Sequence, residues 1–416
     1  MLTVNPGLAG VVAFDTEIAE PDRDGGALRY RGVDIRELAG KVSFGDVWGL
    51  LTSGDFDAGL PAGEPAGSPA RSGGGDAASR RSGGDALAPG EPVGPSARSG
   101  GGGGDAFAGG EPFLLPVHSG DVRVDVQAAV AMLAPRLGMR PLIDIDDAQA
   151  REDLARASVT MLSYVAQSAR GADRPAVPQR LVDAGRSATE RFMIRWQGEP
   201  DPRHVAAIDR YWICAAEHGM NASTFAARVV ASTGADVPAC LSAAVAALSG
   251  PLHGGAPARA LGMVEAVEKT GDARAYVRNV LDGGQRLMGF GHAIYRAEDP
   301  RAQILREAAR ELGAPRYEVA LELERAALAE LRERKPDRVL ATNVEFWAAI
   351  VLDFAQVPAD MLTAMFTCAR SAGWSAHILE QKRLGKLIRP SADYVGPRQR
   401  PAAGLPGWRT AVARNA

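Results

Sequence analysis

The chain has 416 residues, and its 47 Lys and Arg against 50 Asp and Glu give a formal net charge of −3. This balance argues against a general nucleic-acid binder and against a polybasic membrane binder. The three cysteines, Cys214, Cys240 and Cys368, are far apart and form no Cys-x-x-Cys pair, which excludes a disulfide scaffold and a cysteine-based zinc site. Free cysteines suit a reducing cytosol, and no run approaches the roughly 18 apolar residues of a membrane span. We therefore expect a cytoplasmic protein that does not cross a membrane.

The first part of the chain combines two short strand candidates with a segment of unusual composition. The candidates lie near residues 11–14 and 28–30. Residues 57–112 contain 17 of the 48 glycines and seven prolines, and the sequence from Gly84 to Pro92 recurs twenty residues later, from Gly104 to Pro112. A period of this length could indicate a solenoid, but no strand or helix pattern fills the repeats. Because the segment has few large apolar residues, we predict that residues 57–112 are a disordered Gly/Pro-rich insert.

The rest of the chain has mainly helical patterns. Asp201 as an N-cap and Pro202 at the first helical position predict a helix start, and apolar residues follow at helical spacing. Similar apolar stripes predict helices over 237–248, 319–331 and 361–374. Alternating strand patterns are scarce, so we predict an all-α fold.

His253 lies in the first of three segments that can carry chemistry, the Gly-rich stretch GPLHGG at 250–255. A histidine in such an elbow can approach a ligand, and nearby helix N-termini would disfavour its charged form. The alternative is a loop histidine without a task.

The second segment is GFGHAIYRAEDPR, at 289–301. Its two glycines leave backbone amides free to meet a ligand, and its two later arginines can bind carboxylate or phosphate. The alternative is a turn followed by the solvated start of a basic helix, with Asp299 as N-cap and Pro300 at the first helical position. The candidate residues are Gly289, Phe290, Gly291, His292, Arg296 and Arg301.

The third segment, ATNVEFW at 341–347, contains Thr342 and Glu345 at the spacing of a capping box. This structural explanation competes with a functional one. In the first turn of a helix, the dipole would keep the Glu345 carboxylate ionised and ready to accept a proton.

Together, these segments resemble the citrate synthase family. They occur in the order of that family, as GPLHGGA at 250–256, GFGHAIYRAEDPR at 289–301 and TNVEFW at 342–347. The resemblance extends to AEHGMNAST at 216–224 and KLIRP at 386–390, and it covers nearly the whole chain except the Gly/Pro-rich insert.

This resemblance implies a citrate-synthase-like all-α fold in which a smaller helical domain is inserted into a larger one. The large domain would comprise residues 1–56, 113–254 and 361–416, and the mobile, CoA-binding small domain residues 255–360. The family also forms homodimers, and closure of the small domain excludes water during the reaction.

The resemblance also implies a reaction, the Si-type citrate synthase condensation of acetyl-CoA with oxaloacetate and water to citrate and CoA. This reaction is the entry step of the tricarboxylic acid cycle. Glu345 would remove a proton from the thioester methyl group, and a neutral His253 would donate a hydrogen bond to the thioester oxygen. His292 would polarise the ketone of oxaloacetate.

Binding roles follow from the same resemblance. Four residues would bind oxaloacetate, namely His218, Arg301, Arg370 and Arg389, the last reaching in from the neighbouring subunit. Four residues would contact CoA, namely Arg296, Gly289, Phe290 and Gly291. CoA thioester is a co-substrate, and no metal or tightly bound cofactor is implied.

The chain departs from the family pattern at two carboxylates. Glu345 stands where Asp is most common, and Glu217 stands where Asp is usual before His218. Asp353, about two helical turns beyond Glu345, is a rival base outside the motif.

Three alternatives stay open. A 2-methylcitrate synthase would use propionyl-CoA, since one methylene in an acyl pocket changes selectivity only modestly. A catalytically silent paralogue would bind CoA or a dicarboxylate without turnover, although both histidines, the carboxylate and the three arginines argue against it. A scaffold protein acting through the insert would lack aromatic anchors there.

Overall fold

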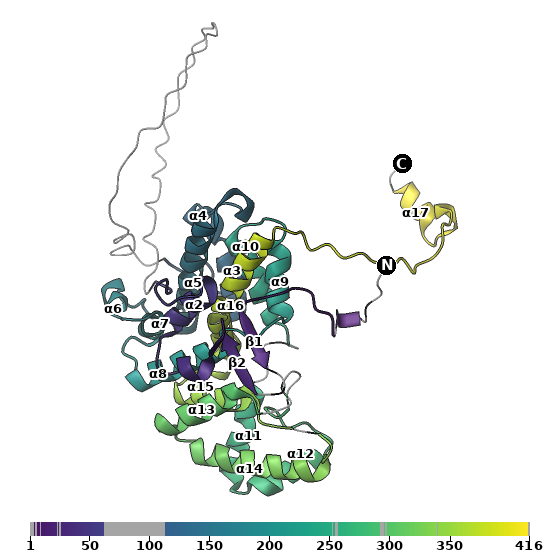
Figure 1. Ribbon diagram of the computed structural model, residues 1–416. Coiled ribbons are helices and arrows are strands. Elements are labelled where there is room, and N and C mark those ends of the chain that lie inside the picture. The colour runs from purple at the N-terminus through teal and green to yellow at the C-terminus, as the bar shows by residue number, and fades with distance from the viewer. Residues whose placement is uncertain are drawn as a thin grey trace, which may run out of the picture. The chain divides into compact units, whose positions relative to one another are not determined.

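The computed structural model describes most of the chain outside the Gly/Pro-rich insert (Figure 1). The described residues are 4, 6–8, 10–22, 24, 26–61, 113–251, 253, 257–291, 295, 298–338 and 340–414. Residues 62–112 of the predicted insert lie outside the described residues. The chain divides into a unit of residues 1–386 and a unit of residues 387–416. Among the described residues, no helix is long and apolar enough to cross a membrane.

A small antiparallel sheet precedes the helices. It contains β1 (Ala19–Asp22), β2 (Ala27–Tyr30) and β3 (Val33–Asp34) in this order. The strand candidate at 28–30 is confirmed within β2, whereas that at 11–14 was wrong, because these residues form no strand. The buried Tyr30 hydroxyl joins the sheet to the end of a helix, since it donates to Ile213 O at 2.9 Å and accepts from Glu217 N at 3.2 Å.

Helices dominate the first unit, which confirms the all-α prediction. The first group comprises α1 (Ile35–Leu38), α2 (Phe44–Ser53), α3 (Val122–Ala131), α4 (Leu133–Leu137), α5 (Asp147–Arg170), α6 (Gln179–Asp183), α7 (Ala188–Gln197), α8 (Pro202–Ala215), α9 (Ala222–Ala231), α10 (Val237–Leu248) and α16 (Leu362–Leu384). Local signals explain several boundaries. Asp201 caps α8 and accepts a hydrogen bond from Arg203 N, with Pro202 in the first turn, as predicted.

The long helix α16 lies at the centre of this group (Figure 1) and packs against α2, α5, α8, α9 and α10. Nearly every position from Leu362 to Leu379 is buried, which is typical of a helix with partners on all sides. Trp374 is fully buried on α16. The elements that carry candidate residues are therefore attached to a helix that has little freedom to move.

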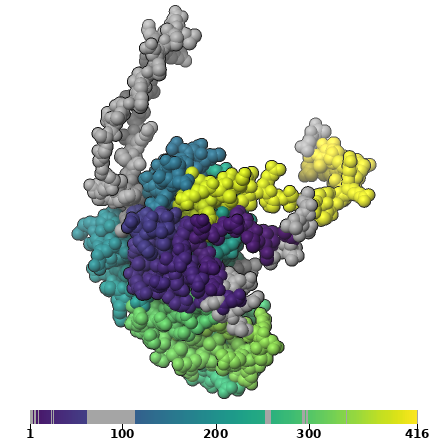
Figure 2. Space-filling model, in the orientation of Figure 1, coloured from purple at the N-terminus to yellow at the C-terminus, as the bar shows by residue number. Residues whose placement is uncertain are grey.

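A second group of helices follows in the chain and appears as a continuous green lobe in Figure 2. It comprises α11 (Pro257–Thr270), α12 (Ala273–Asp282), α13 (Pro300–Glu311), α14 (Tyr317–Arg334) and α15 (Val344–Phe354). The stripe predicted at 319–331 lies within α14. Both α13 and α15 also pack against α8, so these two helices lie beside the first group.

The second unit is short, and its described residues contain the 3-10 helix η4 (Ala402–Gly404) and the α-helix α17 (Trp408–Ala413). Arg389 belongs to this unit and is exposed.

Removing residues 66–112 should leave the thermal midpoint and the turnover of the protein unchanged. Both flanks of the insert are anchored without it. The Leu60 amide donates to Gly45 O at 2.9 Å, and the Arg136 guanidinium lies 4.1 Å from the centre of the Phe113 ring. Thermal scans and activity assays check this expectation, and a collapse of either quantity would show that the insert is structural.

A longer excision provides the control. If it extends through Leu115, it removes the buried Phe113 and Leu115 and should lower the thermal midpoint.

Candidate active site

His253 lies beside the N-terminus of α9, where its ring meets Ser223. His253 Nε2 is 3.0 Å from Ser223 Oγ, and the Ser223 backbone amide donates to the same nitrogen at 3.4 Å. Ser223 Oγ is itself held by Trp374 Nε1, which donates to it at 3.2 Å. The buried α16 thus orients the ring through one serine.

These contacts determine the tautomer of His253. A backbone N–H can only donate, so Nε2 is an acceptor and the remaining ring proton is on Nδ1. Burial lowers the pKa of His253, and the nearby positive charge of Arg370 lowers it further. At neutral pH His253 is therefore a neutral hydrogen-bond donor through Nδ1.

Arg301 is buried at the start of α13, with 3% of its surface exposed, and forms a two-pronged ion pair with Asp299. Its Nε and Nη2 donate to the two Asp299 oxygens at 2.9 and 2.8 Å. Asp299 caps α13 as predicted, but the solvated helix start considered in the sequence analysis was wrong, because both residues are buried. Asp299 Oδ2 also accepts from Val344 N at 2.9 Å, so one carboxylate joins the starts of α13 and α15.

Glu345 is half-buried in the first turn of α15. The capping-box explanation was wrong, because Asn343 is the N-cap and its Oδ1 accepts from Glu345 N at 3.0 Å. Thr342 Oγ1 is buried and has no hydrogen-bond partner among the described residues. The Glu345 carboxylate therefore has no capping task. Burial raises its pKa, which Arg301 partly opposes, so the shift is opposite to that expected from the helix dipole alone.

The rival carboxylate Asp353 lies two turns further along α15. It accepts from Arg316 Nη1 at 2.6 Å, in a partly exposed ion pair. A surface pairing explains this residue without catalysis.

Arg370 extends from α16 toward the same site and is almost fully buried. Its Nε donates to Ala215 O at 3.0 Å, and its guanidinium lies 4.7 Å from the centre of the Phe366 ring. Among the described residues, no side chain or carbonyl accepts from its terminal nitrogens. They can therefore bind a ligand carboxylate in the two-pronged manner of guanidinium groups.

His218 is buried in the segment that joins α8 to α9. Its Nε2 is 3.0 Å from the Tyr295 hydroxyl, and the two rings meet edge to face with centroids 5.3 Å apart. Tyr295 therefore orients the imidazole of a predicted substrate-binding residue.

The Gly289–Gly291 loop is attached to the residues that precede α15. The Gly291 amide donates to Ala341 O at 2.7 Å, and Asn343 N donates to Gly289 O at 2.9 Å. Gly289 has a φ of 82°, and a Cβ there would approach Phe346 Cβ to 2.7 Å, so no other residue fits. The second and third sequence motifs thus form one structural element.

A cavity of about 440 Å³ borders this loop. It combines the aromatic Phe290 and the backbone of Gly291 with three basic side chains, Arg286, Lys335 and Arg338. Such a lining suits an anionic group attached to an aromatic one.

Not every predicted residue can be placed. His292 and Arg296 lie outside the described residues, and Arg389 belongs to the second unit. Among the residues that the structure does describe, no group of three or more His, Cys, Asp or Glu side chains could hold a metal ion. No role was predicted for Ser223, Asn343 or Tyr295, which contact His253, the Glu345 amide and His218 respectively. Only their position inside motifs could have indicated them.

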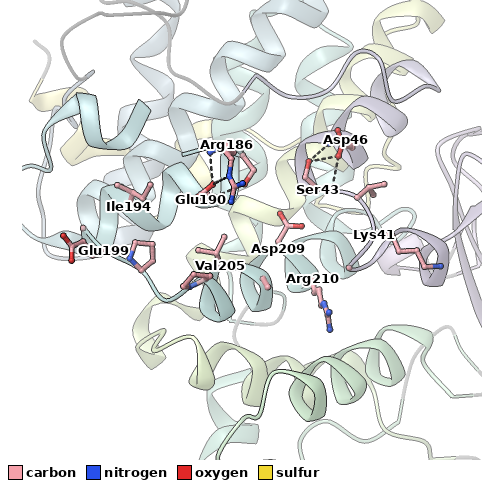
Figure 3. A pocket seen from close by; sticks show the side chains of 17 residues that line it. Lys41, Ser43, Asp46, Arg186, Glu190, Ile194, Glu199, Val205, Asp209 and Arg210 are labelled. Atoms are coloured by element: carbon pink, nitrogen blue, oxygen red, sulfur yellow. Dashed lines mark hydrogen bonds and ion pairs between the residues drawn. The ribbon is translucent and has the colours of Figure 1, made fainter. Parts of the chain in front are cut away.

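A larger cavity, of about 650 Å³, lies between the start of α2 and helices α7 and α8 (Figure 3). None of the predicted site residues lines it. Asp209 faces this cavity, and its Oδ1 accepts from Thr189 Oγ1 at 2.5 Å and from Phe44 N at 3.1 Å. We therefore place the candidate active site at His253, Arg301, Glu345 and Arg370 rather than in this cavity.

Comparison with known proteins now gives the family. The model described as citrate synthase, C-terminal domain, matches residues 7–63 and 115–391. The chain belongs to the citrate synthase family. A Mycobacterium tuberculosis protein named "Putative citrate synthase 2" is 63% identical over 404 residues, which cover 97% of this chain and 96% of the relative. The citrate synthase of Synechocystis sp. is 32% identical, with 98% of this chain and 95% of the relative covered.

Two further comparisons concern substrate and fold. A 2-methylcitrate synthase of Shewanella oneidensis is 40% identical over 202 residues, which cover 47% of this chain and 52% of the relative. The citrate synthase of Thermoplasma acidophilum, solved with carboxymethyl coenzyme A and oxaloacetate, superposes with a TM-score of 0.71 at 23% identity, covering 96% of this chain and 98% of that chain. That likeness establishes the fold of the citrate synthase family for this chain.

The pH dependence of stability should reveal Asp209. Burial raises its pKa to about 6, so above that pH the folded state holds a charge that burial disfavours. Asp209→Asn keeps an oxygen for Thr189 and Phe44 but removes this charge, and should raise the thermal midpoint above about pH 6. The gain should shrink as the pH falls through 6 and disappear below the ordinary Asp pKa of about 3.9, where the residue is protonated in both states.

Thermal scans between about pH 4 and pH 8 measure this difference. Asp201→Asn is the control, because Arg203 lowers the pKa of Asp201 to about 2 and its removal should not raise the midpoint at any pH. A pH-independent gain for Asp209→Asn would contradict the explanation.

Proposed function

We propose that this member of the citrate synthase family condenses acetyl-CoA with oxaloacetate and hydrolyses the citryl thioester to citrate and CoA. The observation that carries the proposal is the proximity of an acid–base group to two buried arginines. Burial raises the pKa of Glu345 against the opposing charge of Arg301. Burial also lowers the pKa of His253, and the charge of Arg370 lowers it further, so the four side chains share one electrostatic environment. The site thus combines a proton acceptor, a neutral donor and cations for a dicarboxylate.

The acid–base step uses Glu345 and His253. A thioester methyl group is a very weak acid, so its proton leaves only if charge on the carbonyl oxygen is stabilised at the same time. Glu345, whose pKa burial raises, is a stronger base than an exposed carboxylate. The Nδ1–H of neutral His253 donates to the thioester oxygen and gives an enol, whose carbon then attacks the ketone of oxaloacetate.

Oxaloacetate binding uses the buried cations. The terminal nitrogens of Arg370 donate to one carboxylate, and Arg301 and His218 complete the pocket from α13 and from the segment after α8. His292 polarises the ketone, and Arg389 is contributed by the second subunit of a homodimer. These side chains must be oriented before oxaloacetate binds, because a charged substrate reacts efficiently in a buried site only if the groups around it are already in place.

CoA binding uses the loop and cavity next to α15. Phe290 and Gly291 border the adenine, while Arg286, Lys335 and Arg338 of the 440 Å³ cavity face the phosphates. Arg296 contacts the same co-substrate. Residues 255–360 act as a mobile small domain that closes on the large domain, formed by 1–56, 113–254 and 361–416. CoA thioester is a co-substrate, and the enzyme works in the cytoplasm without a tightly bound cofactor.

A second substrate is supported by one specific observation, the 40% identity to a 2-methylcitrate synthase over half of the chain. The experiment that tests the function therefore compares acyl groups. CoA thiol release is measured with oxaloacetate and either acetyl-CoA or propionyl-CoA. A higher kcat/KM with acetyl-CoA supports the proposal, a higher value with propionyl-CoA assigns the methylcitrate reaction, and no release with either overturns both.

Glu345→Gln should lose turnover by about 10²–10⁴-fold, because Gln cannot accept the proton. The thermal midpoint should stay near the wild-type value, since Asn343 caps α15 through the backbone amide of residue 345. Glu345→Asp should retain measurable activity. Steady-state kinetics and thermal scans on the same preparations give both quantities.

The matched control is Asp353→Asn on the same helix, which should keep its turnover. If Glu345→Gln turned over at the wild-type rate while Asp353→Asn did not, Asp353 would be the base.

Arg370→Lys should raise the KM for oxaloacetate by about tenfold or more, with a smaller effect on the KM for acetyl-CoA. Lysine keeps the charge but loses the planar pair of terminal donors and the Nε–H to Ala215 O. Steady-state kinetics with each substrate varied in turn measures the KM for oxaloacetate and the KM for acetyl-CoA separately. Arg136→Lys, outside the candidate site, should change neither KM. Equal changes in both KM values for Arg370→Lys would contradict its assignment to oxaloacetate.

A further inference from the structure

Glu217 is an ionisable residue in the core whose role the reaction does not explain. It is 0% exposed, and neither carboxylate oxygen has a hydrogen bond of good geometry among the described residues. Its backbone is held by the Tyr30 hydroxyl, which accepts from Glu217 N at 3.2 Å and shares its one proton between Ile213 O and Glu217 O. A buried carboxylate with so few hydrogen bonds requires a nearby positive charge or a specific task.

The surrounding residues hold the carboxylate in one place. A Cβ on Gly373 of α16 would collide with Glu217 Oε2, so the glycine makes the space that this carboxylate occupies. Gly373 N also donates to Ala216 O at 3.1 Å, which fixes the adjacent backbone. Glu217 is therefore packed directly against α16, one turn from Arg370 on the same helix.

His377, one turn further along α16, faces the same carboxylate. Its Nε2 is 3.4 Å from Glu217 Oε1, and its Nδ1 is 3.0 Å from Arg228 Nη1. A guanidinium can only donate, so Nδ1 is an acceptor and the ring proton of a neutral His377 is on Nε2, toward Glu217. The positive charge of Arg228 is balanced by Glu380, whose Oε2 is 2.5 Å from Nη1. His377 Nε2 therefore faces the Glu217 carboxylate from α16.

Arg370 is a buried cation near Glu217, because its Nε donates to Ala215 O, two residues before Glu217 in the chain. Burial lowers the pKa of Arg370, and Glu217 is the largest of the influences that oppose this shift. Conversely, burial alone would raise the pKa of Glu217, but His377 and Arg370 outweigh it and the pKa lies below its ordinary value. Arg301 has its own carboxylate in Asp299, at hydrogen-bond distance. Arg301 and Arg370, the two buried arginines of the candidate site, thus each have one carboxylate nearby.

The two pairs differ in contact. Asp299 occupies Nε and Nη2 of Arg301, whereas Glu217 lies within no ion-pair distance of Arg370 and leaves its terminal nitrogens open. We propose that Glu217 is the resident counter-charge of Arg370, which stabilises the empty site from a distance and thereby sets how tightly the site holds a dicarboxylate. This inference rests on the proposed function, in which Arg370 binds a carboxylate of oxaloacetate.

The direction of the effect follows from the charges. Without Glu217, a buried guanidinium remains uncompensated in the empty enzyme, which destabilises the fold. The same change removes an anion that repels the incoming dianion, so oxaloacetate gains attraction to the site. A residue with a purely structural role would lower stability equally with and without ligand.

Glu217→Gln in the full-length enzyme separates these possibilities, because Gln keeps the shape and removes the charge. We expect the thermal midpoint without ligand to fall, the rise induced by saturating oxaloacetate to exceed the wild-type rise, and the Kd and KM for oxaloacetate to decrease by about tenfold. The KM for acetyl-CoA should not change. Glu217→Asp keeps the charge and should keep a KM for oxaloacetate close to the wild-type value.

Glu380→Gln is the matched control. Glu380 lies on α16, about 15 Å from Arg370 along the helix axis. Its substitution should lower the midpoint equally with and without oxaloacetate, because it removes the partner of Arg228. If Glu217→Gln cannot be purified, His377→Leu replaces it, since loss of the Nε2–H favours protonation of Glu217 and should also lower the KM for oxaloacetate.

An unchanged or increased Kd for oxaloacetate in the variant that is used overturns the inference. Failure of the proposed function gives a different result. If the wild-type enzyme neither binds oxaloacetate nor releases CoA, the proposed function is overturned. If the wild-type enzyme does both but the variant has an unchanged Kd for oxaloacetate, only the counter-charge role of Glu217 is overturned.

Discussion

The buried ion pair of Asp299 and Arg301 is the contact on which the candidate site depends. Asp299 caps α13, holds Arg301 through two hydrogen bonds and accepts the amide of Val344 at the start of α15. One carboxylate therefore determines where the buried Arg301 guanidinium lies and where the helix that carries Glu345 begins. Removing one partner of such a pair leaves an uncompensated buried charge, which is strongly destabilising.

Burial and charge balance give the site its chemical properties. Exclusion of water raises the pKa of Glu345 and lowers that of His253, which gives a stronger base and a neutral donor in the same site. Buried cations remain charged there because acids lie near them. Asp299 acts on Arg301 by direct contact, and Glu217 is proposed to act on Arg370 from a greater distance. The difference leaves one guanidinium fixed and the other open to a ligand.

Much of this arrangement could be predicted from the sequence, and its limits have physical causes. Helical periodicity and the Asp-Pro pair at 201–202 predicted elements correctly, because local propensity and packing agree there. Thr342 and Glu345 have the spacing of a capping box, but Asn343 caps α15, since its backbone is tied to Gly289. Contacts between distant segments, such as Glu217 with His377, leave no local pattern. The motifs of the family indicated which residues matter but not which partners orient them.

The central claim is that Glu345 removes a methyl proton from the thioester while a dicarboxylate occupies the arginines. Solvent exchange of the methyl protons of acetyl-CoA, followed by NMR with a non-condensing oxaloacetate analogue, tests it most directly because no carbon–carbon bond forms. The account predicts exchange in the wild-type enzyme that requires the analogue, and none in Glu345→Gln. Exchange at the wild-type rate in Glu345→Gln would contradict it.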